Sequence, residues 1–308
     1  MRHPAISLAA RLAIALALGV CAVATGAEAG STATTTTNDR PAAHFDLQRL
    51  AELLDPSSSD VVRNAARAEM LAAADAGNAY AQYDAGVLYR QGDAHPAKVF
   101  PRDLPRARTL LLAAALQGQL SALAKLAEVE FDAGEYAEAM DWAQMYTHYL
   151  REGNEFEAWR AGHIAAMLKR IDDKLGHPDA ETVRQRVIVK LDRYGPTIEA
   201  AQSRAVQSPA SPTLLHMPVS KRHQVGTHRK ANVPETPGVA EFVIAVDTSG
   251  HVNKFWLLDA TPSADLANQL NAVVRDLRFN DAPKGSAEMR YAVAPVAFNN
   301  QRFHLQQK

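Results

Sequence analysis

The sequence is poor in cysteine: its 308 residues include one, Cys21, close to the N-terminus. A single cysteine cannot close an intramolecular disulfide or build a metal site from several thiolates. The chain also lacks an excess of either charge, with 33 Lys and Arg against 34 Asp and Glu. This balance argues against nucleic acid as a partner. We therefore expect no cofactor, no metal site and no nucleic-acid partner.

Motifs that carry common chemistries are absent as well. The sequence has no Gly-x-Ser-x-Gly elbow, no His-Glu-x-x-His helix and no phosphate-binding loop. Ser263 and Asp265 stand near a predicted helix start, where capping explains them. The irregular spacing of His216, His223 and His228 argues against a metal site. We interpret the chain as non-enzymatic, with a hydrolase as the alternative that an activity screen tests.

One long apolar stretch, Leu12–Thr25, follows a short basic start and precedes Ala27-Glu28-Ala29. This order predicts a secretory signal peptide over residues 1–29, cleaved after Ala29. Arg11 ends the apolar run too early for a comfortable membrane span. We therefore predict an exported, periplasmic protein, for which direct membrane insertion is not expected.

A retained membrane anchor and a lipid attached at Cys21 are the alternatives at this end. The lipid anchor needs a small residue before the cysteine, where Val20 stands. Residues 30–43 are rich in Thr and are predicted to form a disordered leader.

Residues 44–206 are Ala-rich, have helical periodicity and repeat themselves. Residues 77–88 are echoed by residues 153–164 in the frame Gly-Asn-x-aromatic-x-x-aromatic-x-Ala-Gly-x-aliphatic. A weaker copy relates residues 72–77 to residues 113–118. Each copy predicts a helix, a turn with glycine and a second helix, and such a period is typical of an α-solenoid.

The same region resembles the Sel-one-like branch of tetratricopeptide-type repeats. The resemblance is carried by Ala85-Gly86-x-x-Tyr89-x-x-Gly92, Asp103, Ala107 and Ala113-Ala114-Ala115-x-x-Gly118. Residues 93–101 are predicted to be an insertion in the turn. The resemblance implies a concave helical surface that can bind a partner.

Aromatic side chains in the repeats allow two interpretations. They could form a groove for a partner peptide, in which Tyr83, Tyr89 and Trp159 are the candidates, but helical spacing favours inter-helix core. The full set is Tyr80, Tyr83, Tyr89, Trp142, Tyr146, Tyr149 and Trp159. The acidic residues Glu128, Glu130, Asp132, Glu135, Glu138 and Asp141 are interpreted as a solvated face.

A further helix is expected to begin at His177 and to stop near Gly195-Pro196, with a separate helical piece over residues 197–206. Residues 207–234, with Pro and Ser followed by a basic stretch, are interpreted as a solvated linker. The domain boundaries that follow are 44–206 for the helices and 235–303 for a second domain.

Residues 235–303 predict a small antiparallel sheet of three strands with one helix. Phe242, Ile244 and Val246 alternate along the first strand, and a tight turn at Ser249-Gly250 leads to the second. In the second strand, Trp256 and Leu258 are expected on the face opposite Phe255 and Leu257. Thr261 is predicted to cap the helix, whose apolar stripe is Leu266, Leu270, Val273, Val274 and Leu277. Pro295 belongs at a sheet edge or a bulge.

This order, with Gly238-x-x-x-Phe242-x-Ile244-x-Val246-Asp247-x-x-Gly250-x-Val252, resembles the C-terminal domain of the TonB family. Leu266, Ala272-Val273, Arg278-Phe279, Pro283 and Gly285 stand where that family has its helix, loop and last strand. The resemblance implies that the domain binds an extended peptide by strand addition.

The predicted architecture is thus an α+β multidomain protein, with a helical-repeat solenoid before a TonB-like domain. A small sheet leaves an edge open, and an open edge favours strand addition over catalysis. We expect a non-catalytic periplasmic adaptor for other envelope proteins or peptides. The candidate binding residues in the last strand are Met289, Tyr291, Val293, Val296 and Phe298.

Three alternatives stay open: a TonB-type energy transducer for outer-membrane transport, a structural envelope protein and a homodimer. The transducer needs an uncleaved anchor and a long Pro-rich spacer, and helical repeats occupy the place of the spacer here. A homodimer would form if the open edge paired with a second copy of itself.

Overall fold

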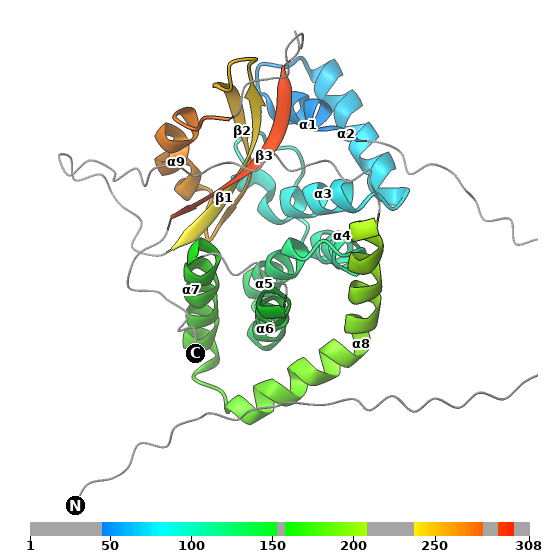
Figure 1. The fold of residues 1–308 in the computed structure, drawn as a ribbon, viewed down its shortest axis with the longest axis vertical. Coiled ribbons are helices and arrows are strands. Elements are labelled where there is room, and N and C mark those ends of the chain that lie inside the picture. The colour runs from blue at the N-terminus through cyan, green and yellow to red at the C-terminus, as the bar shows by residue number, and fades with distance from the viewer. Residues whose placement is uncertain (1–44, 153–157, 208–236, 280–288, 299–308) are drawn as a thin grey trace, which may run out of the picture. The chain divides into compact units, whose positions relative to one another are not determined.

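The computed structural model describes residues 45–152, 158–207, 237–279 and 289–298 (Figure 1). All of them fall in one compact unit, Arg40–Lys308. The predicted signal peptide, the leader and nearly all of the predicted linker lie outside the described residues, as does the start of the repeat copy at residue 153.

In the described part of the chain, eight α-helices precede the sheet. They are α1 (Leu47–Leu54), α2 (Asp60–Asp75), α3 (Ala79–Gln91), α4 (Leu104–Leu116), α5 (Ser121–Ala133), α6 (Tyr136–Glu152), α7 (Ala158–Leu175) and α8 (Ala180–Gln207). A short 3-10 helix, η1 (Gly92–Ala94), follows α3. The prediction of an all-helical first region is confirmed.

Local sequence explains where the turns between helices fall. Gly77 and Gly118 follow α2 and α4, each with φ of 89°, a left-handed conformation that favours glycine. The same closing bond follows each glycine, from the Asn78 amide to the Ala73 carbonyl (2.9 Å) and from the Gln119 amide to the Ala114 carbonyl (3.1 Å). Residues 72–77 and 113–118 therefore adopt the same turn, as their similarity predicted.

Gly86 shows why a small residue is needed inside a helix. It lies in α3 where α3 meets α4, and a Cβ there would come within 2.7 Å of the Leu111 Cγ atom. Glycine in a helix costs about 1 kcal/mol relative to alanine. The close approach of the two helices is the packing reason for that cost.

Helix α8 corrects one prediction. It runs without a break through Pro196, where the sequence predicted a stop. Proline removes one helical hydrogen bond and its ring crowds the preceding turn. Ile198 and Ala201 beyond the proline are buried, and α8 contacts α4 and α6. The packing of this half of α8 outweighs the local preference to stop.

The sheet has three antiparallel strands, as predicted, and the structure places them in the order β2-β1-β3. They are β1 (Gly238–Val246), β2 (Val252–Thr261) and β3 (Arg290–Phe298), with α9 (Asp265–Arg275) between β2 and β3. At the β1–β2 turn the Asp247 carboxylate accepts hydrogen bonds from the amides of Ser249 and His251, and Gly250 has φ of 76°. Pro295 lies in an edge strand, which confirms that prediction.

Strand β2 contains a bulge that the alternation of the sequence does not reveal. Glu241 of β1 pairs with Asp259, whereas Phe242 pairs with Leu257, so Leu258 is an extra residue. A bulge shifts the side chains that follow it to the other face. Asp259 therefore faces the same side as Glu241, not the side of Leu257 that strict alternation predicts.

The two faces of the sheet are covered by different parts of the chain (Figure 1). Helix α9 covers one face with a core of its own, which includes Phe242, Ile244, Leu270 and Val274. On the other face, Val243 and Leu258 join the core of the helical region. Helices α1, α3 and α7 contact strands of the sheet.

One predicted cap is wrong. Thr261 is the last residue of β2 and is buried, and α9 begins at Asp265. The strand outcompetes the cap because the Val239–Thr261 pair continues the β1–β2 ladder to this point.

Candidate functional site

The predicted binding residues of β3 lie at one edge of the sheet but face different ways. Tyr291 and Val293 are half-buried against the helical core, and Val296 is buried in the core with α9. Met289, just before the strand, is 37% exposed. Phe298 ends β3, and its side chain lies outside the described residues. Because these side chains lie on both faces of the sheet, a partner at this edge would meet the main-chain groups of β3 and not one continuous row of side chains.

The two aromatic candidates of the helices whose side chains the structure describes, Tyr83 and Tyr89, are packed inside the fold. Tyr83 is 5% exposed, and its hydroxyl donates to both carboxylate oxygens of Glu241, at 2.9 and 2.7 Å. Tyr89 is half-buried and its ring stacks on Phe100 with centroids 4.0 Å apart. The side chain of Trp159 lies outside the described residues. The interpretation of Tyr83 as core is confirmed, and it faces the chain's own sheet.

A buried cluster of charges joins the helices to the sheet. Asp259, which is fully buried, has one carboxylate oxygen 2.9 Å from Arg90 of α3 and the other 2.6 Å from Lys125 of α5. Lys125 also lies 3.4 Å from Glu241. Both cations are 4% exposed. Buried cations need an anion at contact, because an unpaired buried charge is strongly destabilising.

The protonation states follow from burial and from these partners. Burial raises the pKa of Asp259, but the charges of Lys125 and Arg90 outweigh it and hold that pKa well below its usual value. Burial lowers the pKa of Lys125, but Asp259 and Glu241 bring it above its usual value. Burial and the charge of Glu241 raise the pKa of Asp84 well above the usual range. The cluster thus holds two cations that share the ionised carboxylate of Asp259.

The prediction of a solvated acidic face holds for Glu135 and Glu138, which are exposed, but it is wrong for three other acids of the helices. Glu128, Glu130 and Asp141 are each at most 3% exposed. They pair with Arg170, Arg108 and Arg186, respectively. The sequence did not reveal these pairs because each arginine lies 22 to 45 residues from its acid.

Side chains of the helical region also reach the main chain of β2. The His95 Nε2 atom lies 3.0 Å from the Leu257 carbonyl oxygen, and Gln91 and Arg90 donate to the carbonyls of Leu258 and Ala260 at 3.4 and 3.1 Å. His95 belongs to the segment that the sequence marked as an insertion, residues 93–101. These contacts cap the carboxyl-terminal half of β2, which is an edge strand.

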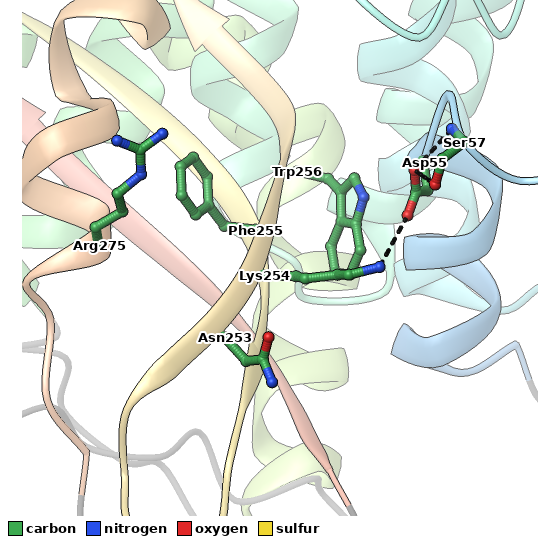
Figure 2. Close-up of a pocket in the computed structure, with 7 residues that line it drawn as sticks. All are labelled: Asp55, Ser57, Asn253, Lys254, Phe255, Trp256 and Arg275. Atoms are coloured by element: carbon green, nitrogen blue, oxygen red, sulfur yellow. Dashed lines mark hydrogen bonds and ion pairs between the residues drawn. The ribbon is translucent and has the colours of Figure 1, made fainter.

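A shallow hollow of about 420 Å³ lies beside the other half of β2 (Figure 2). It is lined by Asp55, Ser57, Asn253, Lys254, Phe255, Trp256 and Arg275. Lys254 lies 3.8 Å from Asp55, and the Arg275 guanidinium lies 5.9 Å from the centre of the Phe255 ring. Its charged residues thus already have partners of their own within the chain.

The β1–β2 turn gathers Asp247, Ser249 and His251, which invites comparison with a hydrolytic triad. The Ser249 Oγ atom lies 2.8 Å from the Asp247 carboxylate and 2.8 Å from the His251 Nδ1 atom. In a triad the acid contacts the imidazole nitrogen that faces away from the serine. Here Asp247 contacts the hydroxyl itself and the same nitrogen, so the arrangement serves the turn.

Among the residues that the structure describes, no group of three or more His, Cys, Asp or Glu side chains is placed to hold a metal ion. Within the same residues, no helix combines the length and the apolar character needed to cross a membrane.

Comparison with known proteins does not show which family the chain belongs to. No family model and no curated protein matches the chain. Among solved structures, it is similar to a protective antigen present in uropathogenic Escherichia coli strains and described as displaying an SLR fold, with a TM-score of 0.34 and 17% sequence identity. The match covers 53% of this chain and 33% of that one, so the chain spans about a third of the length of that protein. The resemblance to the TonB family stays a prediction.

Proposed function

We propose that this chain is a non-catalytic periplasmic protein that binds an extended peptide of another envelope protein along the outer edge of β3. The observation that carries the proposal is the pairing of the sheet. Strand β3 pairs with β1 over all nine of its residues, and in the described part of the chain it pairs with no other strand. The opposite edge, on β2, is partly capped by helix side chains.

Pro295 supports an outward row of main-chain groups on β3. Proline has no amide hydrogen, so in a sheet it belongs where its nitrogen points away from the neighbouring strand. Pro295 lies opposite Glu241 and is exposed. Residues two apart on a strand point their amides the same way, so the amides of Tyr291 and Val293 also point outward. These two donors are the ones that an added strand would use.

The surroundings of Tyr291 favour a partner that carries a basic residue. Burial, and then the charges of Glu52 and Asp46 of the α1 region, raise the pKa of Tyr291. Arg49 already pairs with Glu52 and Glu69. Glu52 and Asp46 thus place negative charge near Tyr291, and such charge complements a lysine or arginine of the peptide.

The compartment rests on the predicted signal peptide. Mass spectrometry of the N-terminus of the exported protein tests it, with a mature start near Gly30 as the expected result. A chain that keeps its first residues in the membrane would instead favour the transducer hypothesis.

The binding proposal is tested with a synthetic peptide of alternating Val and Thr that carries one Lys, titrated into the full chain and followed by calorimetry. Val293→Pro removes an outward amide and should weaken binding about ten-fold, which corresponds to the order of one hydrogen bond. Val293→Thr has a similar shape, keeps the amide and serves as the control.

Three outcomes contradict the proposal: no binding to the folded chain, equal binding to both variants, or binding that survives N-methylation of every peptide amide. Light scattering across a concentration series tests the homodimer, since self-pairing at this edge should also be lost in Val293→Pro.

A further inference from the structure

Strand β2 is held by the helices in the way an extended peptide is held by a receptor. Three side chains from α3 and from the loop after it, Arg90, Gln91 and His95, contact main-chain carbonyls of β2 between Leu257 and Ala260. They satisfy groups that a neighbouring strand would otherwise pair. Main-chain contacts of this kind give affinity, and pockets for individual side chains give specificity.

The specificity pocket here is built for a carboxylate. Asp259 lies between Arg90 and Lys125, and Gln91 also donates to it. Both cations come from the helices and both are nearly fully buried. Two acids of α5 already act on Arg90: Asp132, which lies 3.3 Å from it, and Glu128. Their negative charge limits the additional negative charge that the pocket can accept. It therefore suits the single charge of an aspartate or glutamate better than a phosphate dianion.

The sheet does not depend on this surface for its own core. The core between the sheet and α9 is a separate cluster, which includes Phe242, Leu270 and Val274. The helices form a second cluster, in which Val243 and Leu258 of the sheet are fully buried and against which Trp256, Tyr291 and Val293 pack. The interface between the two thus combines a few apolar contacts with the charge cluster.

We propose that the surface formed by Tyr83, Arg90, Gln91, His95 and Lys125 is a binding site for an extended peptide with an acidic side chain, and that β2 occupies it as an internal ligand. A partner with an extended segment and a carboxylate at the place of Asp259 competes with β2 for this site. The site is distinct from the edge of β3, so it does not rest on the function proposed above.

The experiment uses a fluorescent peptide with the sequence of residues 252–261 and the full chain. In the wild type, the peptide competes with a tethered copy of itself and should bind weakly. Asp259→Asn keeps the shape of β2 but weakens its hold, so the peptide should bind this variant at least about ten-fold more tightly. A peptide with asparagine in place of the aspartate should bind Asp259→Asn without this increase in affinity.

A second variant guards against misfolding of the first. Glu241→Gln removes the negative charge that Lys125 and the Tyr83 hydroxyl meet on the sheet and leaves Asp259 in place, so it should also raise affinity for the peptide. Hydrogen exchange should show that added peptide exposes the amides of β2 and leaves α3 and α5 protected.

Two further variants separate this site from the edge of β3. Binding that is lost in Lys125→Met with Asp259→Asn, and kept in Val293→Pro with Asp259→Asn, supports the proposal. The reverse pattern assigns the peptide to β3 and overturns it. Equal affinity of folded wild type and Glu241→Gln, or indifference to the aspartate of the peptide, also overturns it.

Discussion

The two faces of the sheet differ in chemistry. The face under α9 is covered by apolar side chains such as Phe242, Ile244 and Val274. The face toward the helices combines Val243 and Leu258 with two carboxylates, Glu241 and Asp259, both largely buried.

This difference separates two roles. Apolar burial is non-directional, so the α9 face stabilises the sheet without requiring an exact position for each side chain. Buried charges are worth little net stability, but they tolerate almost no misplacement because each must meet its partner. We infer that the α9 face holds the sheet together and that the charged face determines where the sheet sits on the helices.

The largest expected effect comes from removing the shared anion. Asp259→Ala should lower the free energy of unfolding by about 3–5 kcal/mol, because Arg90 and Lys125 stay buried without it. Urea denaturation measures the change. Asp259→Leu combined with Arg90→Met and Lys125→Met should recover most of the loss, since neither buried cation is left without its anion. Glu241 keeps the hydrogen bonds from Tyr83, and Asp132 keeps Arg102. If the triple variant is as unstable as the single one, the cost is one of shape and not of charge.

The matched change on the other face is Leu270→Ala, which should cost about 2–5 kcal/mol through the cavity that it leaves. Polar substitutions near Leu270 should not recover the lost free energy of unfolding, because the loss comes from a cavity and not from an unpaired charge. If they did recover it, the two faces of the sheet would not differ in what stabilises them.

The next effect concerns pH. Burial lowers the pKa of His163 in α7 from 6.5 to about 4. The unfolded chain then takes up a proton near pH 6.5 that the folded chain refuses until about pH 4. The contribution of His163 to the free energy of unfolding should therefore fall as the pH falls through this range, by roughly 3 kcal/mol at about 1.4 kcal/mol per unit. Asp84, whose pKa burial raises, acts in the opposite direction.

His163→Gln should flatten that slope in urea titrations between pH 7 and pH 4. His95, whose pKa burial also lowers, contributes in the same direction and leaves a residual slope. A wild-type slope that is unchanged in His163→Gln would contradict the assignment.

The smallest effect is expected at the hydroxyl that joins α3 to β1. Tyr83→Phe removes the donor to Glu241 and should cost about 1.5–3 kcal/mol, the range for a hydrogen bond to a charged group. Tyr89→Phe is the control, because the Tyr89 ring stacks on Phe100 and that stacking is kept. Equal stability of the two variants would show that the Tyr83 bond contributes nothing.

Much of the fold could be predicted because its signals are local. Periodicity and glycine turns predicted the helices, and alternation with an Asp-x-x-Gly turn predicted the β1–β2 hairpin. Where a local signal competed with packing, as at Pro196 and Thr261, the prediction failed. Both failures have the same cause, since buried contacts with distant elements outweigh a preference of a few residues.

By itself, the sequence determined that helices precede a three-stranded sheet, and that one short helix lies beside that sheet. These features depend on neighbours within one or two turns of chain. Only the tertiary structure decided that Asp259 meets Arg90 and Lys125, across 169 residues in the case of Arg90. One extra residue in β2 places that carboxylate on the helical face, and a bulge leaves no mark in an alternating pattern. The position of a buried charge is set by partners far away along the chain, because only the folded chain brings them within contact distance.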